Sequence, residues 1–566
     1  MFNVTSTKVL RRGGFVRQIA SVMLLAGAGL GMPNLSAANP ADDYVYTVKQ
    51  GDTVIGLSQR LLTDPVKWRE VATYNRMANP NAISPKQVVR VPLAMLRGAP
   101  ATTTLSGVEG DVKVSTGGSA PASVAALGTA LAEGATVVTG KNGYATLKLA
   151  DGSTVRVQAD SQVQVSRLHN YAEVGILEST FMVVAGRVES LIAKISGSNQ
   201  ARHNVQTRLG NMGVRGTAFR VTMDNNTNQT RSEVLDGVVA VSGADATTEG
   251  KRLTAGFGTI VDASKTVSDP IALLSAPQTA RLPSLMERTL LRFSLPVVDG
   301  ARTYRAQVAR DKDFNGVVAE LVSASPEMRF TDIADGSYFL RVRAVDARGL
   351  EGKDATHAFT LKARPEPPLI SVPAAKGKVR SKEVEFRWAE NAEAATYHLQ
   401  VARDAGFKSL AYESIAVKGA SAIAPNLPLG DYFWRVASLR KDGDKGPYGD
   451  VSSFALLAPP AQPELPSTSG DTIQFRWAGE PGQKFEFQLA DNAQFTKPLV
   501  SRSLDKPELD LPRSGPGTYF MRLRAIDPDG FVGPYTSPQR FSIAPCVTDS
   551  SGRCLATPFG MVAPAQ

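Results

Sequence analysis

Residues 430–438 read Gly-Asp-Tyr-Phe-Trp-Arg-Val-Ala-Ser, a stretch that decides how the C-terminal half of the chain folds. In an extended strand successive side chains point to opposite faces, so Tyr432, Trp434 and Val436 share one apolar face. Arg435 falls on the opposite, more polar face. Because one apolar face needs a second sheet to cover it, the stretch predicts a β-sandwich.

The stretch belongs to an internal repeat. Related stretches begin at Gly336 (Gly-Ser-Tyr-Phe-Leu-Arg-Val-Arg-Ala) and at Gly517 (Gly-Thr-Tyr-Phe-Met-Arg-Leu-Arg-Ala). Each copy also carries an earlier strand-like segment with a shared glutamine, and these glutamines lie 93 and 88 residues apart, at Gln307, Gln400 and Gln488. Roughly 90 residues with about seven strands suit one sandwich per copy. We therefore predict three sandwiches, over residues 285–363, 366–457 and 461–545.

The repeats resemble fibronectin type III domains. Phe386-Arg-Trp388 and Phe475-Arg-Trp477 supply large aromatic residues to the second and third cores, whereas the first copy has Phe293-Ser-Leu295, so we expect its core to be filled differently. The resemblance implies spacers or protein-binding units, and we favour spacers, although fold alone does not distinguish the two. The repeated arginines are expected on the polar face: Arg341, Arg343, Arg435, Arg522 and Arg524.

Residues 43–95 have a strand-like start, two helix-like stretches and a strand-like end. They resemble a LysM domain, a βααβ module that binds N-acetylglucosamine-containing glycans. The resemblance rests on Tyr46-Thr-Val48, Gly51-Asp-Thr-Val54, Leu57-Ser58, Trp68-Arg-Glu-Val71, Tyr74-Asn75, Asn79-Pro-Asn-Ala-Ile83 and Val89-Arg-Val-Pro92. It implies that two loops line a shallow groove for the sugar of peptidoglycan, with these glycan-binding residues: Gly51, Asp52, Thr53, Val54, Asn79, Pro80 and Ile83.

Several of these residues also have a local physical role. Gly51-Asp52 favours a tight turn, and Asp52 or Thr53 can cap the first helix by accepting a free backbone N–H. Trp68, Val71 and Tyr74 fall at helical spacing, so we expect all three to pack inward.

One position departs from the LysM pattern, which has Gly-Gln before its last strand. This chain has Lys86-Gln87 there. A lysine in a turn that needs positive φ would be strained. The departure leaves three readings open: an altered turn, a lowered affinity for glycan, or a LysM fold that no longer binds glycan.

Residues 105–268 contain short alternating strands broken by Gly and Asn. They resemble the FecR-type periplasmic domain through stretches that include Gly107-Val-Glu-Gly-Asp-Val112, Asp151-Gly-Ser153, Phe181-Met-Val-Val-Ala-Gly186 and Gly213-Val-Arg-Gly-Thr217. The resemblance predicts an all-β domain of stacked short strands. Residues 96–104, rich in Pro, Ala and Thr without periodicity, are expected to be a linker ahead of it.

In better-known members the FecR-type domain relays a signal to an anti-sigma segment, which requires a transmembrane helix. This chain has a secretion-like leader and a LysM-like module instead, so we favour a scaffold or sensing role. Arg215 is a candidate partner-binding residue, and the alternative, which we favour, is a structural arginine between Gly213 and Gly216.

Residues 1–38 have the layout of a secretory signal peptide. A basic stretch from Lys8 to Arg17 precedes an apolar run from Ile19 to Leu30, and Ser36-Ala-Ala38 offers small residues for cleavage. The alternative is a membrane anchor, but spanning a bilayer takes about 20 apolar residues. The leader carries four of the ten net positive charges, so the mature chain would carry +6. That mild excess suits an anionic envelope polymer, and it is too diffuse to indicate nucleic acid.

The reactive side chains argue against catalysis. Cys546 and Cys554 lie in the tail 546–566, where an oxidising compartment would favour a local disulfide over two free thiols. The four histidines show no metal-ligand spacing, and His398 is expected at the surface of a repeat strand. We therefore predict no enzyme activity, no cofactor and no metal site.

These features together predict a mainly β, multidomain, non-catalytic protein of the periplasm or cell envelope of a Gram-negative bacterium, without a membrane span in the mature chain. The LysM-like module would bind peptidoglycan, and the other domains would act as scaffold or present surfaces to an envelope protein partner. The alternative is signal sensing or relay through the FecR-like domain.

Overall fold

The computed structural model describes residues 43–117, 121–193, 202–214, 216–245, 250–469, 471–545, 547, 555–557 and 560–561. The predicted signal peptide (1–38), Arg215, Cys546 and Cys554 lie outside the described residues. About half of the chain is strand and about one twentieth is helix, so the fold is mainly β as predicted. The chain divides into two compact units: unit 1 contains the residues up to Ala99 together with Asn170–Ile176, and unit 2 contains the other described residues.

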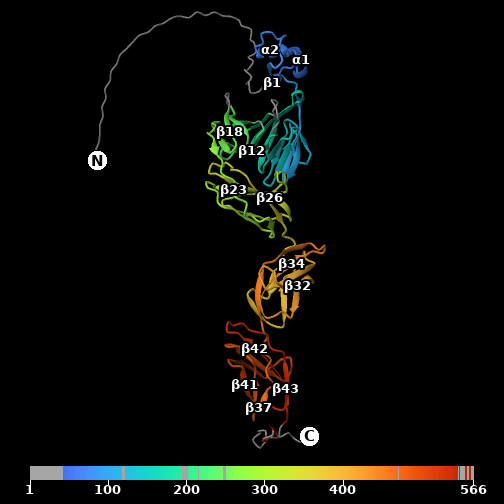
Figure 1. Ribbon diagram of the computed structural model, residues 1–566, viewed down its shortest axis with the longest axis vertical. Helices are drawn as coiled ribbons and strands as arrows, with labels where there is room; N and C mark the ends of the chain where they lie inside the picture. The colour runs from blue at the N-terminus through green and yellow to red at the C-terminus, as the bar shows by residue number, and fades with distance from the viewer. Residues whose placement is uncertain are drawn as a thin grey trace, which may run out of the picture. The chain divides into compact units, whose positions relative to one another are not determined.

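Unit 1 has the βααβ order that the sequence predicts. Two antiparallel strands, with Thr47 opposite Val88, are joined through two helices (Figure 1). This register places the loop after the first strand and the loop before the last strand at the same end of the sheet. The elements are β1 (Asp43–Thr47), α1 (Val54–Leu61), η2 (Pro65–Lys67), α2 (Trp68–Tyr74), β2 (Val88–Pro92) and η3 (Leu93–Met95).

The packing of α2 differs in part from the expectation. Val71 is buried and Trp68 is half-buried, but the side chain of Tyr74 is 36% exposed. The prediction that all three pack inward is therefore wrong for Tyr74. Its hydroxyl donates to the carboxylate of Asp43, 2.8 Å away, which keeps the ring at the surface.

The core of unit 1 includes a segment from far along the chain. Tyr171, Val174 and Ile176 belong to the same cluster of buried side chains as Leu61 and Leu96. These residues connect two long strands of unit 2, and nothing in their sequence indicated where they pack. Leu96 also shows that the stretch expected to be a linker, 96–104, takes part in structure, since β3 and the start of β4 lie within it as well.

The first part of unit 2 is an all-β domain whose strands close into a barrel. Its interior is filled by aliphatic side chains together with Phe181 and Phe219. The longest strand, β12, supplies residues to both the interior and the outer surface. The elements are β3 (Ala99–Pro100), β4 (Thr103–Glu109), β5 (Val112–Ser115), β6 (Ser123–Val124), β7 (Ala130–Leu131), β8 (Thr136–Thr139), β9 (Tyr144–Lys148), β10 (Thr154–Val157), β11 (Ser161–Tyr171), η4 (Ala172–Val174), β12 (Ile176–Leu191), β13 (Arg202–Gln206), β14 (Gly210–Val214), β15 (Ala218–Asp224), β16 (Gln229–Asp236), β17 (Val238–Gly243), β18 (Lys251–Thr254), β19 (Phe257–Val261) and β20 (Ile271–Ala272).

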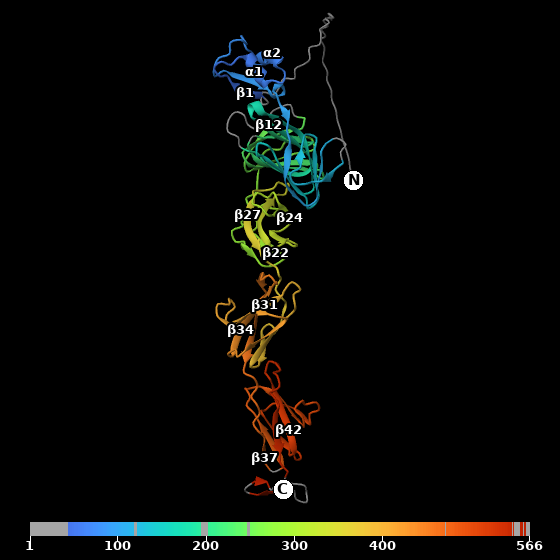
Figure 2. The ribbon, with the colours of Figure 1, turned by 90° about the vertical axis from the view of Figure 1, so that its right-hand side faces the viewer.

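The three repeats fold into sandwiches, each built from a smaller and a larger sheet. Sandwich 1 pairs β22-β25 with β21-β27-β26-β23-β24. Sandwich 2 pairs β28-β30-β33 with β29-β36-β34-β31-β32, and sandwich 3 pairs β37-β38-β41 with β40-β39-β42-β43. Figure 2 shows β31 and β34 within sandwich 2.

The strands of sandwich 1 are β21 (Leu285–Met286), β22 (Leu291–Ser294), β23 (Thr303–Ala309), β24 (Val317–Ser323), β25 (Glu327–Phe330), β26 (Gly336–Val345) and β27 (Ala355–Leu361). Those of sandwich 2 are β28 (Ile370–Val372), β29 (Gly377–Arg380), β30 (Glu383–Trp388), β31 (Thr396–Ala402), β32 (Leu410–Val417), β33 (Ser421–Pro425), β34 (Gly430–Leu439), β35 (Lys445–Tyr448) and β36 (Ser452–Leu457). Those of sandwich 3 are β37 (Ser467–Ser469), β38 (Thr472–Arg476), β39 (Lys484–Ala490), β40 (Val500–Leu504), β41 (Glu508–Pro512), β42 (Gly517–Ile526) and β43 (Gln539–Ile543), and a short hairpin of β44 (Ala556–Thr557) and β45 (Gly560–Met561) follows.

The predicted core residues occupy the sandwich interiors. Trp434 and Tyr432 are fully buried in sandwich 2, as the alternation of the 430–438 stretch requires. Sandwich 1, which lacks the tryptophans, is filled by phenylalanines instead, with the ring of Phe293 5.2 Å from that of Phe359 and 6.3 Å from that of Phe330.

Candidate functional site

The loop after β1 is fixed by Asp52. Gly51 takes a φ of 87°, and the carboxylate of Asp52 accepts hydrogen bonds from the backbone N–H of Lys49 (2.7 Å) and from the hydroxyl of Tyr46 (2.7 Å). These two donors hold the pKa of Asp52 below its usual value. Of the two helix-cap candidates, Thr53 is the cap, since its Oγ1 accepts from the N–H of Gly56 at 3.0 Å.

The loop before β2 keeps its turn although lysine replaces the expected glycine. Lys86 adopts a φ of 72°, the left-handed conformation that favours glycine. The Gln87 side chain accepts from the N–H of Ser84 (3.0 Å), and that of Asn79 accepts from the N–H of Asn81 (3.0 Å). The turn is therefore not altered, and the lysine bears the strain.

Two backbone hydrogen bonds fasten these loops to each other. The N–H of Val48 donates to the carbonyl of Gln87, and the N–H of Lys86 donates to the carbonyl of Val48, both at 2.8 Å. Gly51, Thr53 and Asn79 are exposed on the surface that the loops form. Backbone and side-chain polar groups of both loops are thus held in a fixed arrangement at one end of the domain.

The apolar residues near these loops differ from the expectation in one respect. Val54 is 1% exposed, so it cannot offer a contact to a sugar; it lies on the inward face of α1 together with Leu57 and Leu61. Ile55, the next residue, is 44% exposed and is the apolar side chain that α1 presents to solvent near the loop. Ile83 is half-buried and packs against the core of unit 1, and Pro80 is also half-buried.

A second concentration of polar side chains lies within unit 2, where the barrel meets sandwich 1. Arg341 and Arg343 lie on the polar face of β26, as expected, but this face is buried: the two residues are 4% and 3% exposed. Their guanidinium groups donate to the carboxylate of Glu189 on β12, each at 3.1 Å. The barrel therefore covers the polar face of sandwich 1, which the alternation of side chains alone did not predict.

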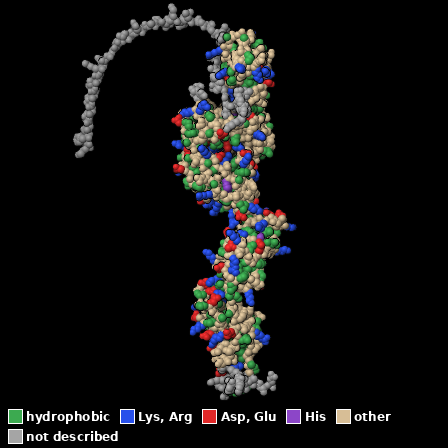
Figure 3. All heavy atoms as spheres, viewed as in Figure 1, with side chains coloured by type: hydrophobic (Ala, Val, Ile, Leu, Met, Phe, Trp, Pro, Cys, Tyr) green, Lys and Arg blue, Asp and Glu red, His purple; other side chains and the backbone are tan. Residues whose placement is uncertain are grey.

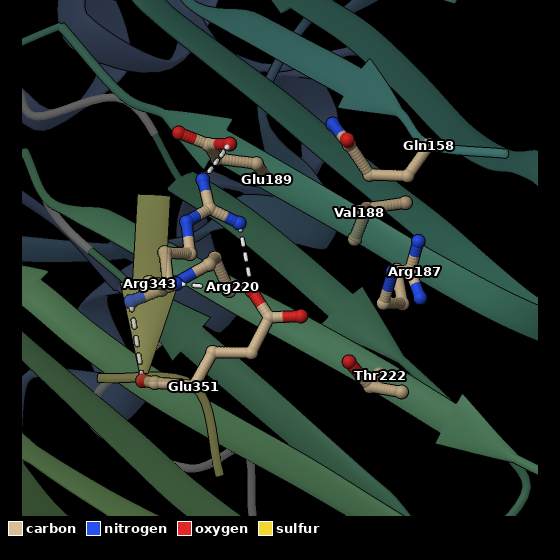
Figure 4. A pocket seen from close by; sticks show the side chains of 8 residues that line it. All are labelled: Gln158, Arg187, Val188, Glu189, Arg220, Thr222, Arg343 and Glu351. Atoms are coloured by element: carbon tan, nitrogen blue, oxygen red, sulfur yellow. Dashed lines mark hydrogen bonds and ion pairs between the residues drawn. The ribbon is translucent and has the colours of Figure 1, made fainter. Parts of the chain in front are cut away.

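The pairing at this junction extends through further ionic residues. Figure 4 shows Glu189 and Glu351 on either side of Arg343, whose Nη1 donates to Glu351 at 2.7 Å. Arg220 of β15 donates to the same carboxylate at 3.1 Å. Burial alone would raise the pKa of Glu189, but the guanidinium groups of Arg341 and Arg343 outweigh it and lower the pKa.

Glu233 on β16 has the opposite character. The residue is 1% exposed, and its Oε1 accepts from the N–H of Glu351 at 3.2 Å. Its Oε2 has no hydrogen-bond partner among the described residues. Burial raises the pKa of Glu233 to about 7, aided by the carboxylate of Glu351 and opposed by Arg220. The junction therefore holds a glutamic acid that is poorly compensated when ionised.

The histidines show no catalytic or metal-binding arrangement in the part of the chain that the structure describes. The Nδ1 of His203 lies 2.9 Å from the hydroxyl of Ser179, but both residues are 2% exposed, and burial lowers the pKa of His203 to about 3. His398 is 9% exposed, so its expected surface position is wrong; the hydroxyl of Tyr448 contacts its ring at 2.9 Å. Among the described residues, no group of three or more acidic, histidine or cysteine residues could hold a metal ion.

Comparison with known proteins identifies two of the domains. The family model described as LysM domain matches residues 46–92, and the model described as FecR protein matches residues 135–240. A protein of Deinococcus radiodurans, described as an uncharacterized protein, is 38% identical over 50 residues, which are 9% of this chain and 20% of that protein. The match thus spans a fifth of the relative's length.

Two solved structures are similar to parts of the chain. A Parabacteroides distasonis protein, described provisionally as an anti-sigma factor, matches at 17% identity with a TM-score of 0.20, over 24% of this chain and 59% of that one. The FN1–FN3 domains of chicken CNTN1 match at 15% identity with a TM-score of 0.20, over 47% of this chain and 98% of that one. No helix in the described ranges is long and apolar enough to cross a membrane. The two family models and the sheets together show a LysM domain over residues 46–92, a FecR match over residues 135–240 and three β-sandwich repeats after it.

Proposed function

We propose that the protein binds peptidoglycan non-catalytically in the periplasm or cell envelope, with the LysM domain as the tether. LysM and FecR domains are typical of extracytoplasmic proteins, and both are binding or signalling domains rather than catalytic ones. The observation that carries the proposal is the pair of backbone hydrogen bonds between Val48 and residues 86–87, which holds two exposed loops together. Backbone groups fixed in this way can bind the acetamido groups of a glycan without reorganising.

The residues that would contact glycan are Gly51, Asp52, Thr53, Asn79, Pro80 and Ile83, with Ile55 replacing Val54 as the apolar contact. On the face that Figure 3 shows, basic and acidic side chains are intermingled over the described residues. The FecR domain and the sandwiches would then serve as scaffold or as surfaces for an envelope protein.

The test is cosedimentation of the full chain with purified peptidoglycan sacculi. Ile55→Ser should reduce the pelleted fraction severalfold, because it removes apolar contact area beside the loops and leaves the core of the domain intact. Val66→Ser is the matched control: Val66 is 72% exposed and lies in η2, which follows the opposite end of α1. Pelleting that both variants leave unchanged would contradict a glycan site at these loops.

The alternative role is signal sensing or relay through the FecR domain, and the family match over residues 135–240 favours it. A receptor or anti-sigma protein that copurifies with the full chain, and is lost when β12 and β15 are altered, would support relay. If the chain binds sacculi but no such partner copurifies, the result would support peptidoglycan binding without a signalling role.

A further inference from the structure

A cluster of three side chains recurs on the same sheet face of all three sandwiches. In each sandwich a glutamine lies directly opposite an arginine on the neighbouring strand, and a phenylalanine packs beneath the arginine. The glutamine–arginine pairs are Gln307–Arg341, Gln400–Arg435 and Gln488–Arg522, and the phenylalanines are Phe314, Phe407 and Phe495.

In sandwich 1 the arginine of the cluster binds a carboxylate. The Nε and Nη2 of Arg341 both donate to Oε1 of Gln307, at 3.1 and 2.6 Å, and its guanidinium carbon lies 4.2 Å from the centre of the Phe314 ring. These contacts fix the guanidinium group and leave Nη1 to project outward. Nη1 donates to Oε1 of Glu189, on a strand of the barrel, at 3.1 Å.

Sandwich 2 has the same arrangement without a carboxylate. Arg435 donates to Oε1 of Gln400 from Nε (3.0 Å) and from Nη2 (2.8 Å), and its guanidinium carbon lies between the rings of Phe407 and Tyr448, 3.9 and 4.0 Å from their centres. Among the described residues, its Nη1 has no hydrogen-bond partner and the guanidinium group makes no ion pair. The carboxylate of Glu413 is held by Gln400 and His398 instead.

Sandwich 3 repeats this open form. Arg522 donates to Oε1 of Gln488 at 2.8 and 2.6 Å and lies between Phe495 and Tyr535, 4.2 Å from the centre of each ring. Within the described part of the chain its Nη1 also lacks a partner. Tyr448 and Tyr535 thus cover only the second flat side of each arginine, and the donating edge stays available.

The backbone is strained at this cluster in every repeat. Phe314, Phe407 and Phe495 all have positive φ, at 57°, 54° and 54°. A bulky side chain in the left-handed region is a genuine outlier, and such strain collects at sites that hold a ligand or a partner. The positive φ recurs at the same position in all three repeats, so it is linked to the placement of the phenylalanine ring beneath the arginine.

Arg435 also lines an open groove of about 440 Å³, together with Tyr448, Arg288 and Asp450. The groove leaves room beside the guanidinium edge for the side chains of an extended segment. Arg288 pairs with Asp450 at 2.7 Å, and Glu287 also lines the groove. Among the described residues, Arg435 makes no ion pair with either of these acidic residues.

We propose that Arg435 and Arg522 are carboxylate-binding residues through which sandwiches 2 and 3 dock an acidic segment of a partner protein. Arg341 shows the occupied form of the same cluster, and its ligand is a glutamate presented by a protein strand. An arginine with a fixed guanidinium plane and a free donating edge suits a carboxylate better than a flexible lysine does. These repeats would then be docking modules rather than spacers.

The test measures binding of the full chain to an immobilised synthetic peptide of alternating Glu and Ser, patterned on Glu189-Ser190. Wild type should bind, and the double variant Arg435→Gln, Arg522→Gln should lose at least about tenfold in affinity, because it removes the charge-assisted hydrogen bonds to the carboxylates. Arg435→Lys, Arg522→Lys should lose nearly as much although it keeps the charge, since lysine cannot be held flat by the glutamine.

The matched control is Arg387→Gln, Arg476→Gln, which removes the same charge from the opposite sheets of the two sandwiches. It should change the affinity less than twofold. An equal loss in the control, full binding by the lysine variant, or no binding by wild type would overturn the proposal. The proposal would also be overturned if the chain did not bind the peptide and the glutamine variant bound sacculi more weakly than wild type. The arginines would then bind carboxylates of the cell wall. This result does not depend on Ile55 or on the LysM loops.

Discussion

Lys86 carries backbone strain in the turn before β2. Its φ of 72° brings Cβ close to the neighbouring carbonyl, at a cost of about 1–2 kcal/mol relative to glycine. Lys86→Gly should therefore raise the free energy of local unfolding of the LysM domain by roughly 1 kcal/mol. The increase is smaller than the full strain energy because glycine also increases the conformational entropy of the unfolded chain. Amide hydrogen exchange in β1 and β2 of the full chain measures this change.

Lys86→Ala is the control for that experiment. Alanine removes the charge and the long side chain but keeps Cβ, so it should leave the protection of β1 and β2 unchanged. An alanine variant that is as stabilised as the glycine variant would show that the lysine side chain, and not the backbone, is the source of the strain.

Local chemistry made several single residues of the LysM domain predictable. The turn at Gly51 and the cap at Thr53 follow from backbone conformation and a missing hydrogen-bond partner, which depend on neighbours in sequence. The choice between Val54 and Ile55 as the exposed apolar residue depends on the phase of α1 against the sheet. That phase is set by Leu57 and Leu61 packing on β1 and β2, and the resemblance alone did not provide it.

At the scale of elements, the alternation of side chains along β26 predicted which residues form its polar face, but it did not predict that another domain packs against that face. Arg341 and Arg343 alternate with buried Leu340 and Val342, as in any sandwich strand. Their partner Glu189 lies about 150 residues earlier in the sequence, in a different domain, and no local pattern links the two. Burial of the face depends on this long-range match of charges between two sheets.

Glu233 on β16 gives the junction a defined pH dependence. In the unfolded chain its pKa returns to the ordinary value near 4.5, whereas in the folded chain burial raises it to about 7. As pH rises from 4.5 to 7 the unfolded chain releases this proton first, so the contribution to stability is full below about 4.5 and is lost as pH rises through 7. The groups that face Glu233 are Arg220, Arg343 and Glu351, on β15, β26 and the turn after β26.

Glu233→Gln removes this titration and keeps an oxygen for the N–H of Glu351. The variant should match wild type at pH 5 and be more stable at pH 8, by an amount on the order of 1–3 kcal/mol, since one pKa unit corresponds to about 1.4 kcal/mol. Denaturant unfolding at the two pH values measures the difference. If the variant were more stable than wild type by the same amount at pH 5, the difference in stability would come from packing and not from the ionisation of Glu233.

At the scale of the whole molecule, the ionic junction should make the FecR domain and sandwich 1 unfold together. The chain has four tryptophans: Trp68 in the LysM domain, Trp388 and Trp434 in sandwich 2, and Trp477 in sandwich 3. Residues 100–363 have none, so tryptophan fluorescence does not report on the FecR domain or on sandwich 1. Calorimetry detects every domain, and the two methods together separate the junction from the remaining domains.

Glu189→Gln leaves Arg156, Arg341 and Arg343 short of one buried carboxylate, which costs roughly 3–5 kcal/mol. The calorimetric transition of the FecR domain and sandwich 1 should fall by on the order of 10 °C. The fluorescence midpoint should move much less, because three of the four tryptophans lie in sandwiches 2 and 3 and only Trp68 lies in the unit that shares its core with residues 171–176. Glu385→Gln is the control, because Glu385 and Arg387 form a pair whose side chains are 43% and 58% exposed, and such pairs are worth at most about 1 kcal/mol. If Glu189→Gln lowers the fluorescence midpoint as much as the calorimetric one, the three sandwiches unfold together. Sandwich 1 is then not coupled more strongly to the FecR domain than to the other sandwiches.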